Sequence, residues 1–273
     1  MINITQSIIL GIIEGFTEFL PISSTAHLIL YNYFTGIDIT NASVKVFEIS
    51  IQFGAILAVI FYYFKDLIKI QNIKLLLISV IPTLALGLIL KDHVSILQEM
   101  PKLIAVNLIV GGLLILITEY FYKKRTIGNK DSQDISSKTI KNKIERVKNI
   151  NYLQGLALGL VQSLAMMPGV SRSGAVIVYG LYKNYDREVI AKFTFLLAVP
   201  TMIAATAYSL LKNYKLILSN GAWSSILIGI VTSFFVAMIV VRYALPFIKK
   251  YSFVPFGYYR ILIGLIILVS LIK

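Results

Sequence analysis

Long apolar runs separated by short polar segments dominate the chain. Six of these runs approach the roughly 20 residues that a helix needs to cross the hydrocarbon core of a bilayer. They lie at about Val44–Phe64, Leu75–Leu90, Leu103–Tyr122, Val189–Leu211, Ser224–Ile248 and Tyr259–Ile272. The pattern predicts an all-α, polytopic membrane protein with about six transmembrane helices.

Two further apolar segments are interrupted by proline and predict helical hairpins. Pro21 divides residues 6–35, and Pro168 with Gly169 divides residues 151–182. A proline inside a helix removes a backbone donor and clashes with the preceding turn. We therefore expect each segment to form a helix, a break and a second helix that leaves on the side where the first entered. Such re-entrant backbone is tolerated at membrane depth where protein or water surrounds it.

The order of features in the first part of the chain recurs in the second. Ser24 and Ser171 each lie three residues after a proline, and each hairpin is followed by three apolar runs. This order predicts a first repeat over 1–122 and a second over 151–273, joined by a linker at 123–150. Because each repeat has three crossings, the second would be inverted relative to the first, an arrangement known among transporters.

Composition and charge agree with a membrane protein. Hydrophobic residues make up 57% of the chain, charged residues 14%, and the mean hydropathy is +0.80. The net charge of +13 could suggest nucleic acid, but most Lys and Arg residues fall on one side of the predicted membrane, nine of them in Lys123–Asn151. Basic loops usually face the cytosol. We expect a cytosolic linker and no nucleic-acid partner. The absence of cysteine excludes disulfides and thiolate chemistry.

Two acidic residues lie inside the first broken segment. Glu14 and Glu18 are four residues apart and would share one face of a helix. Ionised groups at membrane depth are costly and usually face a partner or a wet cavity. A bound cation, a nearby arginine or a shared proton could offset their repulsion. Because residues 1–20 carry these acids and lack a basic start, we expect them to belong to the fold rather than to a cleaved signal peptide.

The two breaks carry groups that suit phosphate. They are Ser23, Ser24, Thr25 and His27 after the first proline and Ser171, Arg172 and Ser173 after the second. A helix that begins inside the protein presents free N–H groups and the positive end of its dipole to an anion. The run Ser23–Thr25 lies where hydroxyls often cap such N–H groups. Arginine can bind two phosphate oxygens at once. We expect one phosphate pocket built from both breaks.

Two more polar residues lie in the first predicted crossing. Glu48 and Gln52 are at helical spacing and could line the same pocket in a supporting role. They could equally form hydrogen bonds between neighbouring helices. The sequence leaves both interpretations open.

These motifs closely resemble those of the undecaprenyl-diphosphate phosphatase family, integral membrane enzymes linked to bacitracin resistance. The family's acidic motif stands here as EGFTEFLPISSTAH over residues 14–27, and its PGxSRSxxT motif stands as PGVSRSGAV over residues 168–176. The resemblance covers essentially the whole chain. One position departs from it, because Val176 replaces the usual threonine and lacks its hydroxyl.

The resemblance implies hydrolysis of undecaprenyl diphosphate to undecaprenyl phosphate and inorganic phosphate. This reaction recycles the lipid carrier of peptidoglycan synthesis and confers resistance to bacitracin. A location in the bacterial plasma membrane follows, with the site opening to the extracytoplasmic side and the polyprenyl tail of the substrate among membrane lipids.

The resemblance also leads to expected roles for the polar residues. The expected catalytic residues are Glu14, Glu18, Ser24, His27 and Arg172, and phosphate binding is expected from Ser23, Thr25, Ser171, Arg172 and Ser173. The attacking group would be Ser24, His27 or water. Glu14 and Glu18 would orient the histidine, relay protons or hold a divalent cation such as Mg²⁺ or Ca²⁺.

Two other functions compete with hydrolysis. A polyprenyl-phosphate transporter or flippase would use the same pocket without cleaving a bond. A lipid phosphatase with two catalytic histidines is excluded, because His27 and His93 both precede the Ser171-Arg172 pair that one of them would have to follow. A homodimer is a further expectation, from a surface rich in tyrosine and glycine.

Overall fold

All regular structure is helical in the computed structural model, which describes residues 2–97, 100–128, 150–219 and 223–271. Its helices are α1 (Ile4–Thr17), α2 (Ser24–Thr35), α3 (Ala42–Leu67), α4 (Ile70–Leu97), α5 (Pro101–Gly128), α7 (Tyr152–Ser163), the short 3₁₀ helix η2 (Leu164–Met166), α8 (Arg172–Tyr182), α9 (Arg187–Ser219), α10 (Trp223–Tyr251) and α11 (Val254–Ser270). The described ranges contain no strand. The prediction of an all-α, polytopic membrane protein is confirmed.

Within the described residues, five helices are long and apolar enough to span a bilayer: α3, α4, α5, α9 and α10. The sixth predicted crossing corresponds to α11, an apolar helix of 17 residues. At a rise of 1.5 Å per residue it is about 25 Å long, at the short end of what crosses a bilayer. Most of the predicted linker, 129–149, lies outside the described residues, whereas 123–128 continue α5.

Both proline-containing segments form a helix, a break and a second helix. Their first helices begin in the same way, with an asparagine and a glutamine that form a capping box. The side chain of Asn3 accepts from the backbone N–H of Gln6 at 2.8 Å, and that of Asn151 accepts from Gln154 at 2.9 Å. Such boxes satisfy N–H groups that a helix start leaves free.

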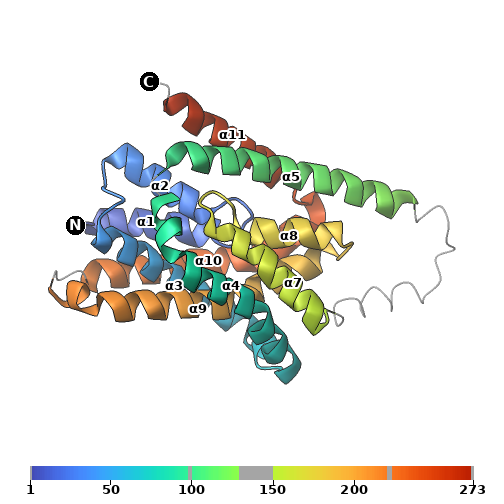
Figure 1. Cartoon of the computed structure of the whole chain (residues 1–273), viewed down its shortest axis with the longest axis horizontal. Coiled ribbons are helices and arrows are strands. Elements are labelled where there is room, and N and C mark those ends of the chain that lie inside the picture. The colour runs from blue at the N-terminus through green and yellow to red at the C-terminus, as the bar shows by residue number, and fades with distance from the viewer. Residues whose placement is uncertain (1, 98–99, 129–149, 220–222, 272–273) are drawn as a thin grey trace.

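Each hairpin packs its first helix against a long helix from the other half of the chain. Helix α1 lies on α10, and α7 lies on α4 (Figure 1). Glycine permits both contacts. A Cβ on Gly11 would lie 2.8 Å from the carbonyl oxygen of Gly229, and one on Gly159 would overlap the carbonyl oxygen of Ser79. The halves therefore interlock, while the repeat boundaries at 1–122 and 151–273 stay a prediction.

The apolar core joins the first break to the second hairpin. Phe19 in the break packs edge-to-face on Phe195 of α9, with ring centroids 5.5 Å apart. The same core includes the fully buried Val176 of α8. On the opposite side of the breaks, α5 and α11 lie side by side (Figure 1). Packing of this kind brings the end of α1 and the starts of α2 and α8 together in the interior.

Candidate active site

One carboxylate connects the two breaks. Glu18 follows the last turn of α1, Ser24 begins α2, and Arg172 begins α8. Arg172 Nη2 donates to Glu18 Oε1 at 2.8 Å, while Ser24 Oγ donates to Glu18 Oε2. The side chains of Glu18 and Arg172 are only 9% and 13% exposed. The structure thus brings these three residues of the two breaks together, while the phosphate pocket expected there stays a prediction.

Arg172 retains unused donors for an anion. Its Nε and Nη1 atoms are buried and have no hydrogen-bond partner among the residues that the structure describes. Because Glu18 occupies only Nη2, the guanidinium can still offer two N–H groups to phosphate oxygens. The first turns of α2 and α8 add backbone N–H groups that have no partner within their own helix, apart from that of Gly174, which Ser171 caps. The geometry therefore favours an anion bound beside Arg172.

Glu14 is the least satisfied group in the cluster. Its side chain is fully buried, and both carboxylate oxygens are without a hydrogen-bond partner in the described ranges. Glu18, Glu48 and Arg172 are its electrostatic neighbours. A buried ionised carboxylate needs a partner, so Glu14 must carry a proton or face a cation.

The residues present give limited support to a metal site. No group of three or more His, Asp or Glu side chains that could hold a metal occurs in the described part of the chain. The protein ligands would then be Glu14 and Glu18 alone. This small donor set fits Mg²⁺, which commonly uses one or two carboxylates together with substrate phosphates and water.

His27 is held by groups other than the acids. Its Nδ1 donates to the carbonyl oxygen of Ser23 at 2.7 Å, which leaves Nε2 of the neutral ring to accept from the hydroxyl of Tyr259 at 2.8 Å. The two rings are nearly parallel, with centroids 5.6 Å apart. The expectation that Glu14 and Glu18 orient His27 is therefore wrong, since both ring nitrogens are engaged elsewhere.

The serines of the second break hold the backbone in place. Ser173 Oγ donates to the carbonyl oxygen of Leu20 at 3.0 Å, and the hydroxyls of Ser171 and Ser173 are 2.9 Å apart. A hydroxyl has one proton, so Ser171 must donate to Ser173. Ser171 Oγ also accepts from the N–H of Gly174 and caps α8. Both hydroxyl protons are thus used within the protein, and neither serine donates to phosphate in this arrangement.

Ser23 departs from its expected role as a helix cap. It has φ 71° and ψ 91°, whereas residues at this position normally have extended backbone. Within the described residues its hydroxyl makes no capping bond to α2. Its contribution is the carbonyl oxygen that fixes His27.

Thr25, Glu48 and Gln52 line a separate small cavity of about 80 Å³, together with Lys45. Asn32 Nδ2 on α2 donates to Glu48 Oε1 on α3 at 2.6 Å. Both interpretations of Glu48 thus describe part of what is seen, because it bonds to a neighbouring helix and also faces a cavity. No hydrogen bond among the described residues supports the expected place of Thr25 in the phosphate pocket, and Thr25 faces this cavity instead.

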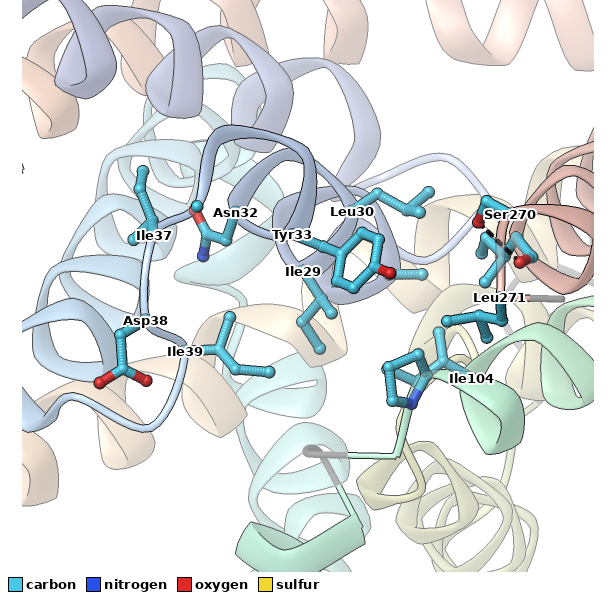
Figure 2. Close-up of a pocket in the computed structure, with 14 residues that line it drawn as sticks. Ile29, Leu30, Asn32, Tyr33, Ile37, Asp38, Ile39, Ile104, Ser270 and Leu271 are labelled. Carbon is cyan, nitrogen blue, oxygen red and sulfur yellow. Dashed lines mark hydrogen bonds between the residues drawn. The ribbon is translucent and has the colours of Figure 1, made fainter. Parts of the chain in front are cut away.

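A larger apolar cavity of about 290 Å³ adjoins the other side of α2. Figure 2 shows Tyr33 of α2, Ile39 of the following loop, Ile104 of α5 and Leu271 after α11 around it. Neither Glu18 nor the second break lines this space. The sequence did not predict this cavity, because its walls come from four separate segments.

Sequence reasoning also missed two polar residues of α11. Tyr259 bonds to His27, and Arg260 bonds to backbone groups of both breaks. Neither belongs to a motif. The sequence did hold one signal, which is that Arg260 is a charged residue at the start of the last apolar run. A charged side chain at membrane depth is energetically costly and usually has a structural or functional role.

Comparison with known proteins identifies similar chains along nearly the whole length. A family model described as Bacitracin resistance protein BacA matches residues 7–266. An undecaprenyl-diphosphatase of Persephonella marina is 44% identical, over 97% of this chain and 98% of its own. Those of Wolinella succinogenes and Campylobacter jejuni are 45% and 41% identical, over 97% and 95% of this chain and 97% and 91% of their own. These matches include both breaks.

Proposed function

The chain belongs to the bacitracin resistance protein BacA family, and from this premise we propose that it hydrolyses undecaprenyl diphosphate to undecaprenyl phosphate and inorganic phosphate. The observation that carries the proposal is the link from Arg172 through Glu18 to Ser24, which joins two distant breaks in an apolar interior. Hydrolysis would recycle the lipid carrier of peptidoglycan synthesis and confer resistance to bacitracin. The alternative of lipid transport gains no support from the relatives, which are named for a diphosphatase.

Arg172 would bind the terminal phosphoryl group. Its Nε and Nη1 atoms have no hydrogen-bond partner among the described residues, so their N–H groups can donate to phosphate oxygens. Charge on these oxygens changes as the phosphoryl group transfers, and a fixed guanidinium in a dry site stabilises that charge strongly. The ion pair with Glu18 holds the guanidinium in one orientation before substrate arrives. Arg172 therefore serves both binding and catalysis in this proposal.

Ser24 is the proposed nucleophile. Its hydroxyl already donates to Glu18, the arrangement of an alcohol and its general base. Ser24 Oγ would attack the terminal phosphorus as its proton passes to Glu18. The bond from that phosphorus to the bridging oxygen would break, releasing undecaprenyl phosphate. Water would then hydrolyse the phosphoserine and release inorganic phosphate. His27, engaged with Ser23 and Tyr259, would hold the break rather than attack.

We include a divalent cation, Mg²⁺ or Ca²⁺, in the proposal. Glu14 and Glu18 would hold it, since the unpartnered oxygens of Glu14 lie beside Glu18 in the interior. When bound, such an ion neutralises charge on phosphate oxygens. Without it, Glu14 would remain protonated to avoid a buried, uncompensated charge.

The apolar helices support a membrane location for the protein. We propose the bacterial plasma membrane, with the site opening to the extracytoplasmic side and the linker 123–150 in the cytosol. The excess of Lys and Arg on the linker side supports this orientation. The polyprenyl tail would remain among membrane lipids while the diphosphate enters the interior. A homodimer stays a prediction.

Phosphate release from undecaprenyl diphosphate by detergent-purified protein tests the proposal. We expect release by the wild type, and loss of release with a chelator followed by recovery with Mg²⁺ or Ca²⁺. Full activity with chelator would contradict the cation and leave the hydrolysis intact. A folded wild type that releases no phosphate, but moves the lipid across vesicle membranes, would contradict hydrolysis and support transport.

A further inference from the structure

Arg260 of α11 is a fully buried cation outside the Glu18 cluster. Its side chain is 1% exposed, and four backbone carbonyl oxygens accept its hydrogen bonds. Nη1 donates to Pro21 at 3.1 Å and Nη2 to Gly169 at 2.9 Å. Nη2 also donates to Asn107 at 3.2 Å, and Nε donates to Leu108 at 3.3 Å. One guanidinium thus contacts both breaks and α5.

The acceptors in the breaks explain what this contact can do. A broken helix exposes carbonyl oxygens as well as N–H groups, and buried carbonyls need partners. Carbonyl oxygens that faced the pocket would repel phosphate. Arg260 binds the carbonyl oxygens of Pro21 and Gly169. The helices that begin just after them, at Ser24 and Arg172, can then present their N–H groups to an anion.

Backbone geometry makes the first break dependent on such support, while the second break uses a glycine. Gly169 has φ 84°, and Ser23, two residues after Pro21, has φ 71°. For a residue other than glycine, this left-handed region costs energy and persists only when surrounding contacts impose it. Asn107 adds to the support from α5, because its Nδ2 donates to the carbonyl oxygen of Pro168 at 2.8 Å. Arg260 bonds to both breaks and to the backbone of α5 at Asn107.

We propose that Arg260 is a positioning residue, which fixes the two breaks relative to each other so that Glu18, Ser24 and Arg172 meet. In this role it would act through backbone carbonyl oxygens rather than through contact with the substrate. Its fixed charge also adds positive potential to a dry interior, where electrostatic effects are strong. The inference rests on the proposed hydrolysis, since its effect is measured through that reaction.

Glycine next to the guanidinium offers a test that leaves Arg260 in the chain. A Cβ on Gly111 would overlap Nη2, so Gly111→Ala must displace the guanidinium from the carbonyl oxygens of Gly169 and Asn107. Gly87→Ala in α4 is the matched control, because its nearest neighbour would be Met166 Cε at 3.7 Å. The control substitution adds the same methyl group to a helix at a site with room for it.

A cavity beside Arg260 permits a second test. A space of about 410 Å³ between α5, α7 and α8 is lined by Arg260, Ser171 and mostly apolar side chains. Arg260→Ala would enlarge this space by the volume of the lost side chain. Guanidinium ions could then enter and bind the vacated carbonyl oxygens, whereas Arg260→Lys would supply one cationic nitrogen that cannot bridge all four acceptors.

The experiment measures kcat and KM for phosphate release by wild type, Arg260→Ala, Arg260→Lys, Gly111→Ala and Gly87→Ala, with thermal unfolding of each. Displacement of reacting groups by about 1 Å can cost about a hundredfold in rate. We expect kcat to fall about a hundredfold in Arg260→Ala and about tenfold in Gly111→Ala. KM should stay within about threefold, because Arg172 still binds phosphate. Guanidinium should raise kcat of Arg260→Ala at least about fivefold and leave Gly87→Ala unchanged.

Two results would overturn the inference while leaving the hydrolysis intact. One is wild-type kcat in folded Gly111→Ala; this variant decides the question if Arg260→Ala does not fold. The other is a fall in thermal stability of the Arg260 variants with kcat of the folded fraction unchanged, which would make the residue merely structural. Failure of the wild type itself to release phosphate would instead contradict the proposed function.

Discussion

Equivalent positions in the two hairpins carry residues with opposite effects on the stability of the fold. In each first helix, a glycine meets the opposite half of the chain, and three residues later comes Glu14 in α1 and Gln162 in α7. Both side chains are buried. Gln162 Nε2 donates to the hydroxyls of Thr83 and Thr201, each at 3.0 Å, and its Oε1 alone lacks a partner, whereas neither oxygen of Glu14 has a partner in the described residues. One hairpin therefore supports the fold, and the other holds a group that costs stability, as functional sites often do.

The serines that follow the prolines differ in the same way. Ser24 donates across the break to Glu18, while Ser171 donates to Ser173 in the first turn of α8 and caps that helix. Among the described residues of the second hairpin, Arg172 is the one that donates a hydrogen bond to Glu18. In the proposed function, the first hairpin supplies the nucleophile and the base, and the second supplies the cation that would bind phosphate.

The largest effect is expected from Arg172→Ala, because it removes the cation that joins the hairpins. Loss of a positioned charge on a transferring phosphoryl group costs about 10³-fold or more in rate. Arg172→Lys should recover only part of this, since lysine lacks the planar fork. Phosphate release by folded protein measures both. Near wild-type turnover in Arg172→Ala would remove the residue from the site.

The two matched serines give the next largest contrast. Ser24→Ala should reduce kcat about a thousandfold, because it removes the proposed nucleophile. Ser171→Ala should lower the free energy of unfolding by about 1 kcal/mol through loss of a helix cap, and reduce kcat less than about tenfold. Activity assays and thermal unfolding separate the two. The assignment of Ser24 fails if folded Ser171→Ala loses as much activity as folded Ser24→Ala.

The sequence alone predicted the helices, the breaks and the motif residues better than it predicted which residues they contact. The long apolar runs, both breaks and the motif residues were predicted, because hydrophobic length and proline act locally. Tyr259 and Arg260 were missed, since their roles depend on α11 lying against α5 and both breaks. Ser171 and Ser173 were expected to bind phosphate, but their hydroxyl protons are donated within the protein. These contacts form when the hairpins pack together and could not be read from the sequence.

Exchanging the acid Glu14 and the amide Gln162 tests whether the two hairpins differ in their effect on stability. Glu14→Gln should leave stability unchanged or raise it, because a neutral amide is less costly to bury, and should reduce kcat at least about tenfold. Gln162→Glu should destabilise the fold by about 1–3 kcal/mol, since it loses the amide donors to Thr83 and Thr201. Thermal unfolding and phosphate release report both. Equal effects in the two variants would show that the hairpins do not differ in this way.

The smallest effect is expected at the position that departs from the family motif. Val176 is fully buried in the apolar core, and by the resemblance it replaces a threonine whose hydroxyl it lacks. Val176→Thr should leave kcat and KM within a few-fold of wild type, with a modest fall in thermal stability because a hydroxyl replaces a packed methyl group. A much larger gain in activity would show that the hydroxyl matters for binding or chemistry.

A double-mutant cycle on Glu18 and Arg172 tests most directly whether the two breaks form one site. The measured quantity is kcat/KM for phosphate release from undecaprenyl diphosphate by wild type, Glu18→Gln, Arg172→Gln and the double variant, each checked for folding. Residues that act as a unit show strongly non-additive losses. We predict that the double variant is about as impaired as the worse single variant. Losses that multiply, as for independent residues, would contradict a single site built across both hairpins.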